Sequence, residues 1–145
     1  MRIFVPLILL IVGKFQRRFP KKILVVGGDL EILNTINLML GLEGYDIEIL
    51  SDGKPIIKNQ AIVPDLYIID KVVPSSNGLQ ICNSIKSNEK TKSIPVVIIS
   101  ATDSKSEALA AGADQFIQKP FLMHTFLKCV AEMLNLPPQS SWIKA

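Results

Sequence analysis

The stretch Ile23-Leu24-Val25-Val26-Gly27-Gly28-Asp29 contains a short strand and the start of a helix. Four consecutive apolar residues without alternation are typical of a strand that is buried on both faces, as in a parallel sheet. The two glycines end this strand, and Asp29 is of a residue type that caps helices. Apolar side chains then recur at helical spacing, at Ile32, Leu33, Ile36 and Leu40. The stretch therefore predicts one βα unit, whose helix ends near Gly41 and Gly44.

The same order of a strand and a helix recurs four more times along the chain. Further strands are predicted at residues 46–50, 66–70, 96–100 and 115–118, and further helices at approximately 55–61, 78–86, 105–111 and 122–134. Five βα units favour a parallel sheet with right-handed crossovers and with helices on both faces. We therefore predict an α/β fold, a doubly wound three-layer sandwich, in which chemistry collects at the carboxyl ends of the strands.

Length and composition indicate one globular domain. The chain has 145 residues, of which 48% are apolar and 20% charged, and this excludes two full domains, a disordered polyelectrolyte and a collagen-like chain. Cys82 and Cys129 match no metal or redox spacing, so we expect two helix-packing thiols in a reducing compartment. His124, the single histidine, has no predicted acid or nucleophile beside it, and we expect it at the surface without a catalytic role.

The charges are divided unevenly between the first 22 residues and the rest of the chain. Six of the 16 Lys and Arg residues lie there, without any acid, so the remainder carries 10 basic and 13 acidic side chains. Such a mildly acidic body lacks the clustered cations that bind a phosphate backbone. We therefore predict no nucleic acid partner.

Residues 1–20 form an apolar and basic extension before the predicted domain. The apolar run Ile3–Gly13 is interrupted by Pro6 and, at about 1.5 Å per residue, reaches only roughly half of a ~30 Å membrane core. Basic residues in the stretch 14–18 stand where a cleaved signal peptide needs small residues, so we reject such a signal. Two interpretations stay open: contact with a membrane interface through residues 3–18, and an extension without function.

Three polar side chains end predicted strands: Asp70, Ser100 and Lys119. Because the carboxyl ends of parallel strands meet at one edge of the sheet, we expect a carboxylate, a hydroxyl and an ammonium group to converge. A carboxylate beside a cation and a hydrogen-bond donor suits phosphoryl acceptance, since the transferred group carries negative charge on its oxygens. The simpler alternative is an ion pair between Asp70 and Lys119 with no further role, but three such groups on one edge favour chemistry.

From Lys22 to about Leu136, the sequence resembles the receiver domain of two-component response regulators. The resemblance rests on the first strand, the phosphoacceptor segment, the hydroxyl-bearing strand and a closing signature, at Lys22–Val26, Ile69–Pro74, Val96–Ala101, Ala111–Asp114 and Lys119–Phe121. It implies a flavodoxin-like sandwich whose five-stranded parallel sheet has the order 2-1-3-4-5. We accordingly expect an extension at residues 1–20, a receiver-like domain at 21–136 and a short tail at 137–145.

The resemblance also implies roles for four residues. Asp70 accepts a phosphoryl group from a phosphohistidine on a histidine kinase or a phosphotransfer protein. Ser100 hydrogen-bonds one phosphoryl oxygen, and Lys119 pairs with another. Phe116 stands at the aromatic switch position, where it lacks the hydroxyl group of the commoner Tyr.

The end of the first strand departs from the family pattern. Receivers usually carry two adjacent acids there, which hold Mg²⁺ together with the phosphoacceptor and a loop carbonyl, and this chain has Gly27 and Gly28 instead. Mg²⁺ takes about six oxygens, so Asp70 and the carbonyl of Val72 would leave most ligands to water. We therefore expect weak or absent Mg²⁺ binding. Asp29 is the one candidate substitute, but we expect it to cap the following helix.

Two further departures point to a locked resting site, and the second of them lies on the face through which receivers signal. Lys71 is expected to place an extra positive charge beside Asp70, and the stretch 100–112 is about one helical turn shorter than usual. Because no competing acids remain, we also expect a stable Asp70–Lys119 pair without metal, which would lock the resting site.

Two functions follow from this pattern. The first is a single-domain receiver in phosphorelay signal transduction, phosphorylated at Asp70 and acting through other signalling proteins. The second is a degenerate receiver that works as a protein-interaction module without phosphorylation, which Gly27 and Gly28 favour. An anion-binding cradle at these glycines is disfavoured, since the wider glycine spacing is absent. We expect no enzyme activity, a cytoplasmic location, and no output domain after Leu136.

Overall fold

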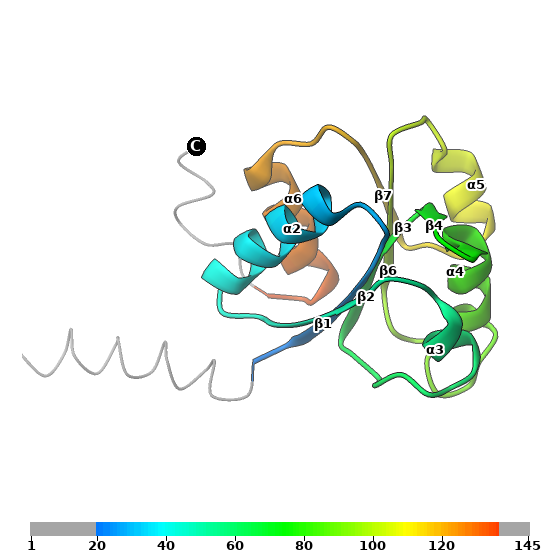
Figure 1. The fold of residues 1–145 in the computed structure, drawn as a ribbon. Coiled ribbons are helices and arrows are strands. Elements are labelled where there is room, and N and C mark those ends of the chain that lie inside the picture. Colours follow the sequence, from blue (N-terminus) through cyan, green and yellow to red (C-terminus); the bar gives the residue numbers. More distant parts are fainter. Residues whose placement is uncertain (1–19, 137–145) are drawn as a thin grey trace, which may run out of the picture.

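The computed structural model describes residues 20–136, which fold around one five-stranded parallel sheet (Figure 1). The strands are β1 (Lys22–Val26), β2 (Asp46–Leu50), β3 (Leu66–Asp70), β6 (Val96–Ser100) and β7 (Gln115–Gln118). Their order across the sheet is β2-β1-β3-β6-β7, and every neighbouring pair is parallel. The predicted strands and strand order are therefore confirmed, with β1 beginning one residue earlier than the apolar run.

Five helices cover the two faces of this sheet, which confirms the three-layer sandwich (Figure 1). The helices are α2 (Leu30–Leu42), α3 (Lys54–Ile57), α4 (Gly78–Lys86), α5 (Lys105–Ala110) and α6 (Met123–Met133). Helices α2 and α6 pack on one face, where Ile36 and Phe126 are completely buried. Helices α3, α4 and α5 pack on the other face, around Ile81 and Ala108.

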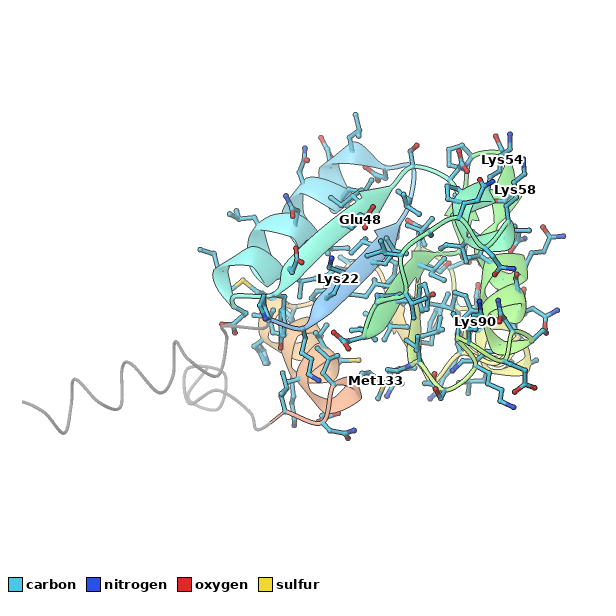
Figure 2. The ribbon with its side chains drawn as sticks, turned by 90° about the horizontal axis from the view of Figure 1, so that it is seen from below. Lys22, Glu48, Lys54, Lys58, Lys90 and Met133 are labelled. Carbon is cyan, nitrogen blue, oxygen red and sulfur yellow. The ribbon has the colours of Figure 1, made fainter. Side chains whose placement is uncertain are left out.

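Burial explains why the three central strands read as continuous apolar runs. Every residue of β3 and β6 is buried, as are the last four residues of β1. Strand β2 lies at the edge and includes Asp46 and Glu48, and Figure 2 labels Glu48 on β2 and Lys22 on the neighbouring strand β1. Lys22 pairs with Asp46 across these two strands at 3.3 Å.

The prediction for α3 was wrong at its end. A helix was expected over residues 55–61, but α3 ends at Ile57 because Asn59 adopts a left-handed conformation with φ of 56°. The N–H groups of Gln60 and Ala61 then both donate to the carbonyl of Pro55, which forms a turn. Asparagine tolerates this conformation better than most residues, so the helix stops here without a glycine.

A small hairpin after β3 was not predicted. It consists of β4 (Val72–Val73) and β5 (Ser76–Asn77), joined by a turn in which Ser75 has φ of 64°. The side chain of Asn77 accepts a hydrogen bond from the N–H of Leu79 at 2.7 Å and so caps α4. The hairpin therefore connects the end of β3 directly to the next helix.

The predicted extension, apart from residue 20, and the predicted tail at 137–145 lie outside the described residues. The open question of membrane contact through residues 3–18 falls there as well. Within residues 20–136, each helix is too short or too polar to cross a lipid bilayer.

Candidate functional site

An open pocket of about 440 Å³ lies at the carboxyl edge of the sheet. Its lining includes Gly28 and Asp29 from the end of β1, Asp70 from β3, and Lys119 after β7. The hairpin adds Val72 and Pro74 to the lining. Ala101 also lines the pocket, whereas Ser100 does not. The pocket therefore lies at the predicted edge of the sheet, and Asp70 is part of its lining.

Asp70 and Lys119 form a partly buried ion pair in this pocket. Lys119 Nζ lies 2.8 Å from Asp70 Oδ2, and Asp70 is only 3% exposed. The second carboxylate oxygen, Oδ1, accepts a hydrogen bond from the N–H of Val72 at 3.1 Å. Both oxygens of Asp70 are thus engaged, and the predicted pairing of Asp70 with Lys119 is confirmed.

Ser100 reaches the same edge, but its hydroxyl group is directed elsewhere. Ser100 Oγ accepts a hydrogen bond from the N–H of Thr102 and shares another with Thr102 Oγ1, both at 3.1 Å. The link between Ser100 and Lys119 is a backbone bond, from the N–H of Lys119 to the carbonyl of Ser100 at 2.7 Å. Two of the three predicted groups therefore meet by their side chains, whereas the Ser100 hydroxyl bonds to Thr102 instead.

Phe116 lies on β7 next to this edge and is partly buried. Its ring packs against the core on the side of α4 and α5. The proposed switch role of Phe116 stays a prediction.

The expectation for Lys71 was wrong. Its ammonium group does not stand beside the Asp70 carboxylate but reaches α5, where Nζ donates to Ser104 Oγ at 2.9 Å and lies 3.3 Å from Glu107. Consecutive residues at the end of a strand point in different directions, which explains why neighbours in sequence have separate partners. The sequence placed Thr102 at this edge without giving it a role, and it missed Ser104, whose one available signal is the alternation of hydroxyl residues at 100, 102 and 104.

The chain matches the response regulator receiver domain over residues 23–131, which covers the sheet apart from Lys22 at the start of β1, and every residue of the pocket. It belongs to this family. Receiver domains act in two-component signalling, where they interact with histidine kinases or phosphotransfer proteins and generally bind Mg²⁺ in the active site. The resemblance found in the sequence is therefore confirmed.

Curated relatives of this receiver are response regulators. It is 38% identical to response regulator ArlR of Staphylococcus saprophyticus over 84% of this chain and 56% of the relative. It is 31% identical to the DNA-binding dual master transcriptional regulator RpaA of Synechocystis, over 79% of this chain and 49% of the relative. The receiver thus spans about half the length of the curated relatives that it matches.

Solved receiver structures share the fold. The chemotaxis response regulator CheY4 of Vibrio cholerae superimposes with a TM-score of 0.73 at 26% identity, over 79% of this chain and 99% of that one. The receiver domain of the sensor histidine kinase PA1611 from Pseudomonas aeruginosa, with a magnesium ion coordinated in its active-site cleft, gives 0.73 at 20% identity. That match covers 80% of this chain and 98% of the PA1611 domain, and it bears on the fold only. The flavodoxin-like sandwich is therefore confirmed.

The donor groups around Asp70 do not fit the Mg²⁺ ion of other receivers. A Cβ atom added to Gly28 would lie 2.6 Å from Pro74 Cδ, and one added to Gly27 would lie 3.3 Å from Leu33 Cδ2. Pro74 therefore occupies the space of a side chain at residue 28, whereas a side chain at residue 27 would only be tight against Leu33. Within residues 20–136, there is no group of three or more His, Cys, Asp or Glu side chains that could hold a metal ion. A hard cation that needs about six oxygens finds two carboxylates in this pocket, Asp29 and Asp70, and Asp70 is already paired with Lys119.

The Asp29 side chain caps helix α2. Its Oδ1 accepts hydrogen bonds from the N–H groups of Glu31 at 3.0 Å and Ile32 at 3.4 Å. These bonds satisfy two free donors at the start of α2, so the predicted capping role is confirmed. A contribution of Asp29 or of the Val72 carbonyl to a metal site stays an untested prediction.

The two cysteines and the histidine considered in the sequence analysis lie outside the pocket. Cys82 and Cys129 are both buried and free, and burial raises the pKa of each thiol to about 11. They are therefore neutral packing residues at ordinary pH, as predicted. His124 is exposed on α6, also as predicted.

Proposed function

We propose that this receiver serves two-component signalling as a protein-interaction module whose conformation does not depend on Mg²⁺-supported phosphorylation. The observation that carries this proposal is the Asp70–Lys119 pair at 2.8 Å, in a pocket whose second acid, Asp29, caps α2. The sequence ranked phosphoryl acceptance first. The paired Asp70, together with the absence of acids at residues 27 and 28, reverses that order.

Electrostatics supports this proposal. A phosphoryl group in transfer places negative charge on its outer oxygens, and a rapid transfer needs cations at those oxygens. In this pocket the available cation is Lys119, and it already neutralises Asp70. Attack by Asp70 would have to break this pair, and the incoming phosphoryl charge would then meet a single ammonium group. Phosphoryl transfer to Asp70 is therefore expected to be slow, whereas the folded domain can still bind a partner protein.

Phosphoryl acceptance at Asp70 is the second candidate. Its support is that Asp70 lines an open pocket with Lys119 at hand and Ser100 next to it. In this version Asp70 is the acceptor, Ser100 and Lys119 bind the phosphoryl oxygens, and Phe116 responds to the modification. Phosphorylation would then proceed with little dependence on Mg²⁺.

Both candidates share the remaining expectations. We propose a non-enzymatic role, in which the receiver contacts a histidine kinase, a phosphotransfer protein or another signalling protein. Direct binding of nucleic acid by this chain is not proposed, since the charge of the body is mildly acidic. A relative such as RpaA is described as DNA-binding, but this chain covers 49% of it.

One experiment separates the two candidates. The full chain is incubated with acetyl phosphate, with and without Mg²⁺, and its intact mass is compared with that of Asp70→Asn and of an ordinary receiver under the same conditions. We expect the ordinary receiver to gain a phosphoryl group and this chain to gain none. A gain that disappears in Asp70→Asn would overturn the interaction-module proposal and establish the second candidate.

A further inference from the structure

A chain of hydrogen bonds leads from Lys71 through three hydroxyl groups to the end of β6. Lys71 Nζ donates to Ser104 Oγ at 2.9 Å, and Ser104 Oγ bonds to Thr102 Oγ1 at 2.9 Å. Thr102 Oγ1 in turn bonds to Ser100 Oγ at 3.1 Å. The same lysine forms an ion pair with Glu107 on α5 at 3.3 Å. One side chain from the end of β3 therefore holds both the loop after β6 and the following helix.

Ser104 shows that this contact replaces an ordinary local one. Ser104 is the N-cap residue of α5, where a serine hydroxyl normally accepts from the helix N–H groups. Here it makes no such capping bond, and the residue is only 2% exposed. Its hydroxyl is used by Lys71 and Thr102 instead. The start of α5 is thus held by a distant lysine rather than by its own cap.

The hydrogen-bond chain closes into a ring with the Asp70 pair. Lys71 follows Asp70 directly, Asp70 is paired with Lys119, and the N–H of Lys119 donates to the carbonyl of Ser100. Ser100 is the far end of the hydroxyl chain. A change in the Asp70–Lys119 pair can therefore reach α5 from both sides of the ring, through Lys71 and through Ser100.

We propose that Lys71 is a latch, which ties the loop 101–104 and α5 to the end of β3 and couples their position to the Asp70–Lys119 pair. While the latch is closed, Ser100 keeps its hydroxyl on Thr102, and α5 holds one fixed position. Helix α5 exposes Leu109 (46%), so the latch also sets the surface that this helix offers to a partner. The latch acts whether or not Asp70 is phosphorylated, and it does not rest on the proposed function.

The first test opens the latch. Amide hydrogen exchange is compared in the full chain, in Lys71→Met, and in the control Lys58→Met, whose lysine lies at the outside of the molecule next to α3 (Figure 2). In Lys71→Met we expect at least about tenfold faster exchange in residues 101–112, because a charge-assisted hydrogen bond is lost there. Strands β1 and β2 should keep their protection, and the control should match the wild type. Unchanged exchange in residues 101–112 would overturn the latch.

The second test measures the coupling, which a purely structural contact would not show. The shifts of the amide NMR signals of residues 105–110 caused by Asp70→Asn are recorded in the wild-type background and in Lys71→Met. We expect clear shifts in the first background and a loss of most of them in the second. Equal shifts in both backgrounds, or none in either, would overturn the coupling. If Lys71→Met does not fold, Ser104→Ala interrupts the same chain of bonds and replaces it in both tests.

Discussion

The ends of β1 and β3 lie side by side in the sheet, with Val26 opposite Ile69, yet they differ in the chemistry that follows them. After β1 come Gly27 and Gly28, where a side chain would be tight against Leu33 at residue 27 and would overlap Pro74 at residue 28. At the end of β3, Asp70 keeps a buried carboxylate that is paired with Lys119. One strand end is therefore followed by two residues without charge, whereas the charge at its neighbour is neutralised by an ammonium group.

This arrangement has a consequence for stability. A buried ion pair adds little net stability compared with apolar residues of the same size, but removal of one partner leaves an uncompensated charge. Other receivers place several acids and a cation at this edge, whereas here one acid and one base balance each other. The β3 end should therefore tolerate loss of both charges far better than loss of one.

The largest expected effect comes from breaking the balance at the β3 end. Lys119→Met should lower the free energy of unfolding by about 3 kcal/mol, because the Asp70 carboxylate stays buried without its cation. Denaturant unfolding at neutral pH measures this loss. The exposed-lysine variant Lys58→Met should change the same free energy by less than about 0.5 kcal/mol.

The double variant Asp70→Asn/Lys119→Met sharpens this result. It removes both charges, so its stability should lie well above that of Lys119→Met. A loss below about 1 kcal/mol in Lys119→Met would show that the pair does not balance a buried charge, and the contrast between the two strand ends would then fail.

The second prediction restores acids at the β1 end. Gly27→Asp/Gly28→Asp should destabilise the chain by about 2 kcal/mol, because a side chain at residue 28 overlaps Pro74 and the new carboxylates repel Asp70. Added Mg²⁺ should recover part of this loss, while the wild type should show no change in melting temperature. The comparison is made against NaCl at equal ionic strength. A Mg²⁺-dependent rise in the wild type would contradict the metal-free interpretation.

The smallest expected effect concerns Asp29, the acid that remains at the β1 end. Asp29→Ala should cost about 1 kcal/mol of stability through loss of the α2 cap, and Asp29→Asn only a few tenths, since asparagine also caps helices. Both losses, measured by denaturant unfolding, should be the same with and without Mg²⁺. A larger loss for Asp29→Asn in Mg²⁺ would instead assign Asp29 to a metal site.

The strands and the Asp70–Lys119 pair were predictable because they rest on strong local patterns. Buried parallel strands are continuous apolar runs, and the polar residues at their ends must meet at one edge. The end of α3 could not be predicted from the pattern, because a single residue in a left-handed conformation, Asn59, ends the helix inside an otherwise helical pattern. The β4–β5 hairpin was missed because strands of two residues show no periodicity.

The α/β sandwich, the place of the pocket and the absence of acids at residues 27 and 28 follow from the amino-acid sequence, because they depend on residue type and spacing along the chain. The directions of Lys71 and of the Ser100 hydroxyl, and the position of Pro74 against Gly28, depend on the tertiary structure. These outcomes depend on the directions of side chains from segments far apart in sequence. Such directions are set by packing between β3, β6 and the helices, which no local pattern encodes.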